Sequence, residues 1–88
     1  MTAMSKVTNG ATLRHSRVWD MITFIASFDD IGVTLTQIQA YMLANHGLKF
    51  QTTAQYVYEC RLAGFLTERD GLWHVTEKQR KSLLKKVA

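Results

Sequence analysis

The sequence contains no proline, one cysteine and no long hydrophobic run. A single cysteine, Cys60, cannot form an internal disulfide, which is typical of a protein in a reducing compartment. The longest apolar patch, residues 21–28, is interrupted by Thr23 and Ser27, and crossing a bilayer takes about 20 apolar residues. The N-terminus also lacks the charged-then-apolar pattern of a secretory signal. We therefore expect a cytoplasmic protein with no membrane partner.

Patterns that carry catalysis or hold metals are also missing. His15, His46 and His74 are far apart and show no metal-ligand spacing among themselves or with Cys60. There is no glycine-rich phosphate loop and no nucleophile motif. Adjacent acids at 29–30 are more typical of a turn than of a general acid/base pair. We expect neither an enzyme nor a bound cofactor.

Positive charge is what the chain has in excess. Its 88 residues allow one domain with a modest core, and they carry a net charge of +4. The excess is concentrated at the C-terminal end, in Lys78, Arg80, Lys81, Lys85 and Lys86 against Glu77. Such a segment favours a polyanionic partner. It is equally explained by solubility and by the preference of lysine for the end of a helix.

Hydrophobic spacing predicts two helices in the first half of the chain. Residues 1–12 show no periodicity and are expected to form a flexible tail, whereas 13–28 carry an apolar stripe at helical spacing. A second helix should begin after Thr34, because Gln37 three residues later completes a capping box. It should end at 45–47, where residues tolerate a left-handed cap. Its expected buried side chains are Ile38, Tyr41 and Met42.

The second half predicts a third helix, a hairpin and a final helix. The third helix should span 51–63, with Gly64 stopping it and an inward face formed by Phe50, Ala54, Val57 and Cys60. Asp70-Gly71 is a strong signal for a two-residue hairpin turn, since both positions of a type I′ turn need positive φ. The strands should cover 65–69 and 72–76, with Leu66, Trp73 and Val75 on one face. The final helix should begin at 76 or 77 and pack through Leu83, Leu84 and Val87.

Two stretches in this order resemble a known family. "TLTQI", residues 34–38, resembles the capped second helix of winged helix-turn-helix domains, and "AGFLTERDGLWHVTEKQRK", residues 63–81, resembles their recurrent ending. The arsenical-resistance and multiple-antibiotic-resistance regulators are similar here. The resemblance implies an α+β, mostly α fold, in which three helices, a two-stranded β-hairpin wing and a C-terminal helix form a single domain over residues 13–88.

That resemblance also implies a function. The chain would be a sequence-specific double-stranded DNA-binding protein, a small transcriptional regulator acting as a homodimer, with its third helix in the major groove. Outward residues of that helix would read bases: Gln51, Thr52, Gln55 and Tyr56. Phosphate or groove contacts would come from the basic side chains and one histidine elsewhere, namely Lys49, Arg69, His74, Arg14, Arg17 and Lys78.

Two other functions stay open at this point. The third helix has one arginine and one glutamate, so it carries no net charge, and Arg-to-guanine is the commonest specific contact to DNA. A winged-helix protein-interaction module, acting as an adaptor or inhibitor of a larger complex, would use exposed aromatics such as Tyr56, Tyr58 and Trp73. RNA binding through the basic surface is the third possibility.

Overall fold

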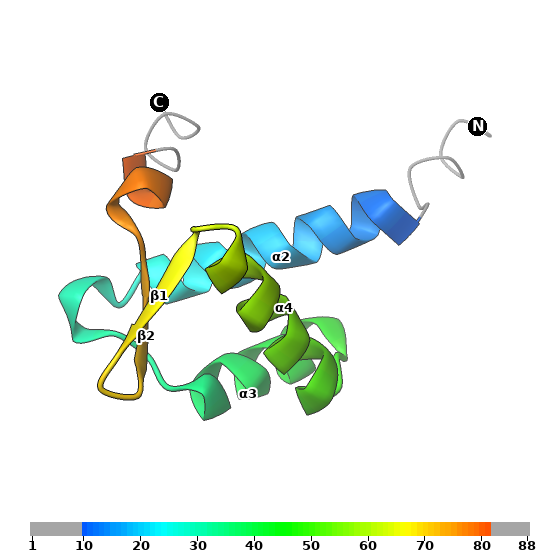
Figure 1. Cartoon of the computed structure of the whole chain (residues 1–88). Helices are drawn as coiled ribbons and strands as arrows, with labels where there is room; N and C mark the ends of the chain where they lie inside the picture. Colours follow the sequence, from blue (N-terminus) through cyan, green and yellow to red (C-terminus); the bar gives the residue numbers. More distant parts are fainter. Residues whose placement is uncertain (1–9, 82–88) are drawn as a thin grey trace.

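A computed structural model describes residues 10–81 and shows an α+β, mostly helical fold (Figure 1). The order of elements is α2 (Gly10–Ala26), a 3-10 turn η1 (Asp29–Ile31), α3 (Leu35–His46), α4 (Phe50–Leu62), β1 (Leu66–Arg69) and β2 (Leu72–Val75). A further helix begins at residue 77 and is described to 81. The predicted fold class is confirmed, with a layout compatible with a winged helix. Of the tail expected over 1–12, residues 10–12 are helical instead, whereas residues 1–9 lie outside the described residues. So do Leu83, Leu84, Lys85, Lys86 and Val87.

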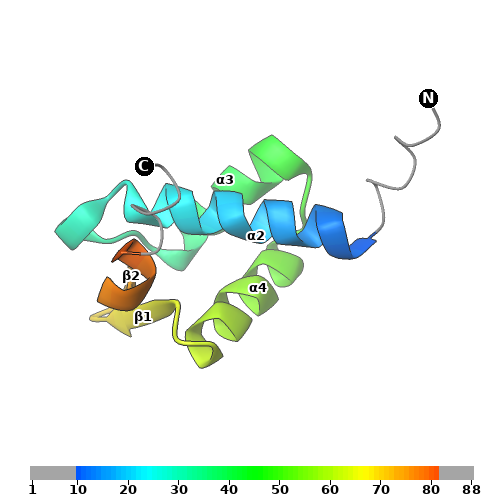
Figure 2. The same cartoon turned by 90° about the horizontal axis from the view of Figure 1, so that it is seen from above.

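The helices and the hairpin enclose one hydrophobic core. Helices α3 and α4 pack against each other, and α2 crosses over the pair, as the view from above shows (Figure 2). The hairpin closes the remaining side, where β1 contacts α4 and β2 contacts α2 and η1. Every element from α2 to β2 except η1 contributes buried apolar side chains, together with the segments that connect them: Met21, Ile22, Ile25, Val33, Ile38, Met42, Leu48, Tyr56, Val57, Cys60, Leu66, Trp73 and Val75.

Local signals account for both ends of α3. Thr34 Oγ1 accepts a hydrogen bond from the Gln37 amide at 3.2 Å, and Gln37 Oε1 accepts one from the Thr34 amide at 3.0 Å. These bonds satisfy amides that a helix leaves unpaired in its first turn. At the other end Gly47 adopts a left-handed φ of 66°, and its amide donates back to Leu43. The predicted capping box and glycine cap are confirmed.

Helix α2 is displaced from its predicted range, and α4 is rotated. Helix α2 begins at Gly10 rather than 13 and ends at Ala26 rather than 28, because the chain turns into η1. On α4 the predicted inward position of Phe50 is wrong, since Phe50 is 47% exposed. The buried stripe consists of Thr53, Tyr56, Val57 and Cys60. Helical spacing alone is compatible with burial of either of two neighbouring stripes of α4. Packing against α2, α3 and β1 determines that the stripe containing Thr53 is the buried one.

The hairpin has its predicted register. Leu66 pairs with Val75 and Arg69 with Leu72, around a turn in which Asp70 and Gly71 have φ of 54° and 79°. Leu66, Trp73 and Val75 share the buried face, as expected. An additional backbone pair joins the hairpin to the connection between α2 and α3. The Val33 amide donates to the Trp73 carbonyl at 3.1 Å, and the Trp73 amide donates to the Val33 carbonyl at 2.7 Å.

His74 lies on the other face of the hairpin, where it was predicted to meet solvent or the DNA backbone. That placement is wrong, because only 6% of His74 is exposed. The 29–33 segment lies over this face, where it is held by the Val33–Trp73 pair. Gly32 approaches the imidazole so closely that a Cβ built on it would lie 2.6 Å from His74 Cε1. Sequence periodicity carries no signal for this cover, since it depends on a contact between segments about 40 residues apart.

Replacement of Gly32 tests this close approach. A Gly32→Ala variant would combine a positive φ of 79° with a Cβ that collides with His74. We expect the free energy of unfolding to fall by about 2–4 kcal/mol, measured by urea denaturation. Gly71→Ala is the comparison variant, because Gly71 has the same φ and a Cβ placed on it would meet no heavy atom within 4 Å, whereas Gly32 also has a ψ of 175° that only glycine adopts readily. Its loss should be only about 1–2 kcal/mol. Equal losses in the two variants would mean that the contact with His74 contributes nothing.

Candidate nucleic-acid interface

The solvent face of α4 is divided into a polar half and an apolar half. Gln51, Gln55, Tyr58 and Leu62 follow one another at intervals of four, three and four residues, so they form one stripe, and all four are exposed. The half near the start of the helix presents two glutamine amides. The half near its end presents Tyr58, which is 57% exposed, and Leu62, which is 70% exposed. Thr52 is half-buried at the edge of the stripe.

Tyr56 does not belong to this stripe. It was predicted to face outward and read bases, but it is only 8% exposed and lies among the buried residues of α4. The Arg14 guanidinium covers its ring, 5.2 Å from the ring centroid. Tyr56 comes three residues after Thr53 and one before Val57, so it shares their buried side of the helix. Its ring is part of the core.

The two arginines of α2 differ in their contacts. Arg14 forms an ion pair with Glu59 of α4, and the Gln55 side-chain nitrogen Nε2 donates to Glu59 Oε2 at 3.4 Å. Arg17 is half-buried, and its Nε is buried without a hydrogen-bond partner among the described residues. Arg14 is therefore already paired within the protein, although about half of its side chain remains accessible.

The start of α4 is open to solvent. Lys49 occupies the N-cap position with no side-chain hydrogen bond to the first-turn amides, and Lys49, Phe50 and Gln51 are all exposed. A helix carries a partial positive charge at this end, where its first amides lack helical partners. Gln39 of α3 donates from Nε2 to the Phe50 carbonyl at 3.1 Å, which ties this end to the preceding helix. The local potential at this end therefore favours an anion.

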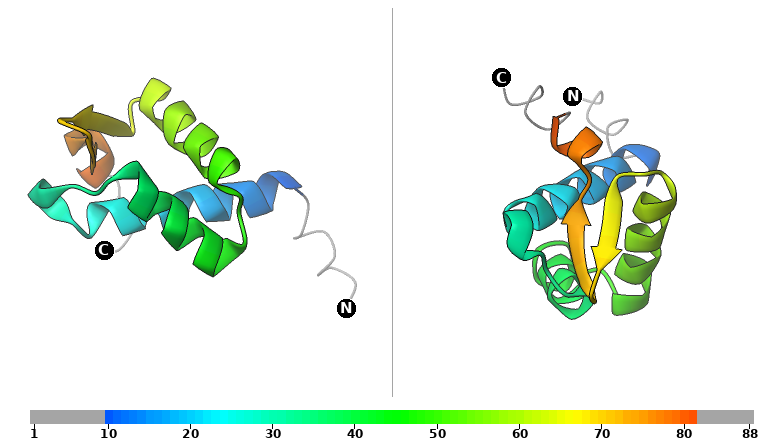
Figure 3. Two further views of the ribbon diagram at one scale, coloured as in Figure 1. Left: turned by 90° about the horizontal axis from the view of Figure 1, so that it is seen from below. Right: turned by 60° about the vertical axis from the view of Figure 1, so that its left-hand side comes forward.

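In Figure 1 the hairpin turn and the starts of α3 and α4 all lie along the lower side of the molecule, but Figure 2 and the left view of Figure 3 show the start of α4 well apart from the hairpin turn. Arg69, the last residue of β1, is exposed beside the turn and forms no ion pair within residues 10–81. Its neighbours Glu68 and Asp70 are acidic and exposed. Lys78 follows β2, so it lies at the opposite end of the hairpin from the turn. Lys49 and Gln51 therefore lie at the start of α4, Arg69 lies beside the hairpin turn, and Lys78 follows the opposite end of the hairpin.

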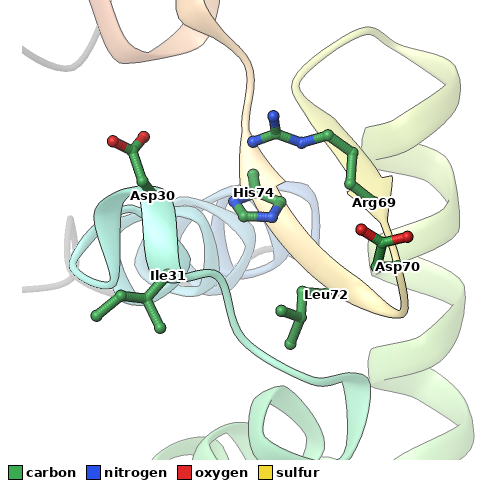
Figure 4. Close-up of a pocket in the computed structure, with 6 residues that line it drawn as sticks. All are labelled: Asp30, Ile31, Arg69, Asp70, Leu72 and His74. Carbon is green, nitrogen blue, oxygen red and sulfur yellow. The ribbon is translucent and has the colours of Figure 1, made fainter.

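A hollow of about 280 Å³ separates the hairpin from η1 (Figure 4), and its lining residues are Asp30, Ile31, Arg69, Asp70, Leu72 and His74. Carboxylates stand on both sides of it. Nearby, Arg80 pairs with Asp29 at 3.1 Å, which links the final helix to η1. The buried Nδ1 of His74 has no hydrogen-bond partner among residues 10–81. The lining of the hollow thus combines two carboxylates with the Arg69 guanidinium and the His74 imidazole.

A second polar cluster joins α2 to α3. Tyr41 donates its hydroxyl hydrogen to the Asp20 carboxylate, with oxygen–oxygen distances of 2.9 and 3.0 Å, and His46 Nε2 lies 2.7 Å from Asp20 Oδ2. Burial raises the pKa of Tyr41, and the hydrogen bond and the charge of Asp20 act in the same direction. Sequence reasoning missed this cluster, because Asp20 is more than 20 residues from both partners. Its evident role is to fix α2 against α3.

Comparison of the chain with models of protein families, with curated proteins and with solved structures finds no match. Within residues 10–81, no group of three or more histidine, cysteine, aspartate and glutamate side chains could hold a metal ion. No helix in that part of the chain has the length and hydropathy to span a membrane.

Cys60 provides a pH-dependent test of the packing of α4. Burial raises the pKa of its thiol from 9.0 to about 11, the Glu59 charge acts in the same direction, and Arg14 opposes it. The folded protein therefore holds the thiol proton more tightly than the unfolded chain. The contribution of the protonated Cys60 thiol to stability is fully present below pH 9 and is lost as the pH rises through about 11.

We accordingly expect the free energy of unfolding to fall across this alkaline window, in chemical denaturation at a series of pH values. In a Cys60→Ala variant the free energy of unfolding should fall less over the same pH range, because there is no thiol to ionise. At pH 8 a thiol reagent should label native Cys60 far more slowly than it labels the unfolded chain. Equal labelling rates in the two states would show that the thiol is accessible.

Proposed function

We propose that this protein binds double-stranded DNA in a sequence-specific manner, with α4 in the major groove, as a small transcriptional regulator. One observation carries the proposal. The polar half of the α4 stripe, Gln51 and Gln55, begins at the uncapped start of the helix beside Lys49. Base-reading amides, a cation and the positive end of a helix therefore coincide.

The dimensions suit B-form DNA. A helix with its side chains is about 10–12 Å across, and the major groove is about 12 Å wide. A glutamine amide can donate to and accept from the edge of adenine at once, and Thr52 can contact a thymine methyl. Lys49 would neutralise a phosphate and fix the register, which is the usual task of such contacts. The homodimer suggested by the resemblance stays a prediction.

Protein binding is the second candidate, and the apolar half of the α4 stripe favours it. Tyr58 and Leu62 are exposed large side chains on adjacent turns of one helix face. Tyr56 and Trp73, which were also expected to serve such an interface, are each only 8% exposed and belong to the core. RNA is the weakest candidate, since the deep and narrow major groove of A-form RNA does not admit a helix.

Replacement of the two glutamines tests base reading. Gln51→Ala and Gln55→Ala should each relax the base preference at one position, with a loss of about 1–3 kcal/mol of discrimination. The measurement is selection of bound duplexes from a random library, followed by sequencing. Ser16→Ala, at an exposed position of α2, is the control and should keep the wild-type preference. A preference that survives both glutamine replacements would exclude them as readers.

Salt dependence tests the phosphate contact. In fluorescence anisotropy with one duplex at several salt concentrations, Lys49→Gln should lower the slope of log affinity against log salt by about one. Lys78→Gln removes the same charge at the opposite end of the hairpin, so it should leave the slope nearly unchanged. If the wild-type protein binds no duplex even at low salt, the DNA proposal fails and the apolar stripe becomes the surface to test against proteins.

A further inference from the structure

Glu59 is the only acidic residue of α4, and it lies beside the residues proposed to read DNA. A carboxylate in this position repels phosphates, so its presence next to Gln55 calls for a physical reason. Its two oxygens have different partners. Oε1 pairs with the Arg14 guanidinium, and Oε2 accepts a hydrogen bond from Gln55 Nε2 at 3.4 Å.

Arg14 is itself held in place. Its guanidinium lies over the ring of Tyr56, 5.2 Å from the centroid, and that ring is fixed in the core. A series of contacts therefore connects the buried Tyr56 ring to the exposed stripe of α4. It runs from Arg14 to Glu59 and from Glu59 to Gln55. Pairing with Arg14 also neutralises the charge of Glu59, which lessens its repulsion of a DNA backbone.

We propose that Glu59 is a positioning residue that orients the Gln55 amide for recognition of adenine. The inference rests on the proposed function. A glutamine amide has two N–H donors and one carbonyl acceptor. The contact to Glu59 uses one N–H, so the second N–H and the carbonyl remain for the two hydrogen-bonding groups of adenine in the major groove. A Gln55 side chain held by this contact in the free protein would lose less conformational entropy on binding.

The test compares Glu59→Ala with Glu59→Gln in the full chain, with selection from random duplexes and anisotropy as readouts. Glu59→Ala should reduce the preference at the position read by Gln55 by about twofold to tenfold. Affinity for a non-specific duplex should stay equal or rise, because a negative charge is removed. Glu59→Gln retains an acceptor for Gln55 and should keep most of the preference. A merely structural role would lower both affinities together.

The Gln55→Ala background supplies the matched control. There, adding Glu59→Ala should change the preference no further, since the side chain that Glu59 orients is gone. A second readout needs no DNA. In the free protein, ¹⁵N relaxation should show the Gln55 side-chain amide becoming more mobile in Glu59→Ala and staying ordered in Glu59→Gln.

The outcomes separate this inference from the proposed function. If the wild type binds DNA with a base preference that Glu59→Ala leaves intact, the positioning role is overturned and DNA binding stands. An equally mobile Gln55 amide in wild type and Glu59→Ala overturns it as well. If the wild type binds no duplex at any salt concentration, the proposed function fails and this inference fails with it.

Discussion

The backbone pair between Val33 and Trp73 determines where the hairpin lies. Its two hydrogen bonds join the α2–α3 connection to β2, and Gly32 lets that connection approach the His74 ring. A two-stranded hairpin on its own is only marginally stable in water. Here it gains a third segment on one edge and a core face formed by Leu66, Trp73 and Val75. The hairpin is thereby held against η1 and the core.

The same attachment gives the two faces of the hairpin different characters. One face closes the core, and the other is covered by η1, with a hollow lined by both acidic and basic side chains. The hairpin turn itself presents Arg69 between two acids. In the proposed DNA complex the hairpin would serve mainly as a structural support for α4, with Arg69 as its one cationic contact at the turn. Base reading would then fall to the helix.

The thirteen residues of α4 form a side that is buried in the core and a side that faces solvent. Thr53, Tyr56, Val57 and Cys60 hold the helix against the core, and the opposite side offers amides first and apolar groups later. Glu59 stands between these two sides, with Arg14 from α2 paired to it. An arginine that sequence reasoning assigned to phosphate contacts is thus placed where it can compensate an acid on the helix that would meet DNA. In the proposed complex, this ion pair would reduce the repulsion between Glu59 and the DNA phosphates.

Local chemistry by itself determined the elements and most of their ends. The Thr34 capping box, the left-handed cap at Gly47, the Asp70-Gly71 turn and the hairpin register all depend on residues within a few positions of one another, so the sequence predicted them correctly. The exposed positions of Gln51 and Gln55, at the centre of the candidate site, were also predicted correctly.

Tertiary structure decided which of two adjacent stripes of α4 is buried, and so removed Tyr56 from the set of outward residues and exposed Phe50. It also buried His74, through a contact with the 29–33 segment about 40 residues away, and joined Arg14 to Glu59 across 45 residues. Periodicity limits a helix to a few possible faces, but the choice among them depends on the shape of its neighbours. That shape exists only once the chain has folded.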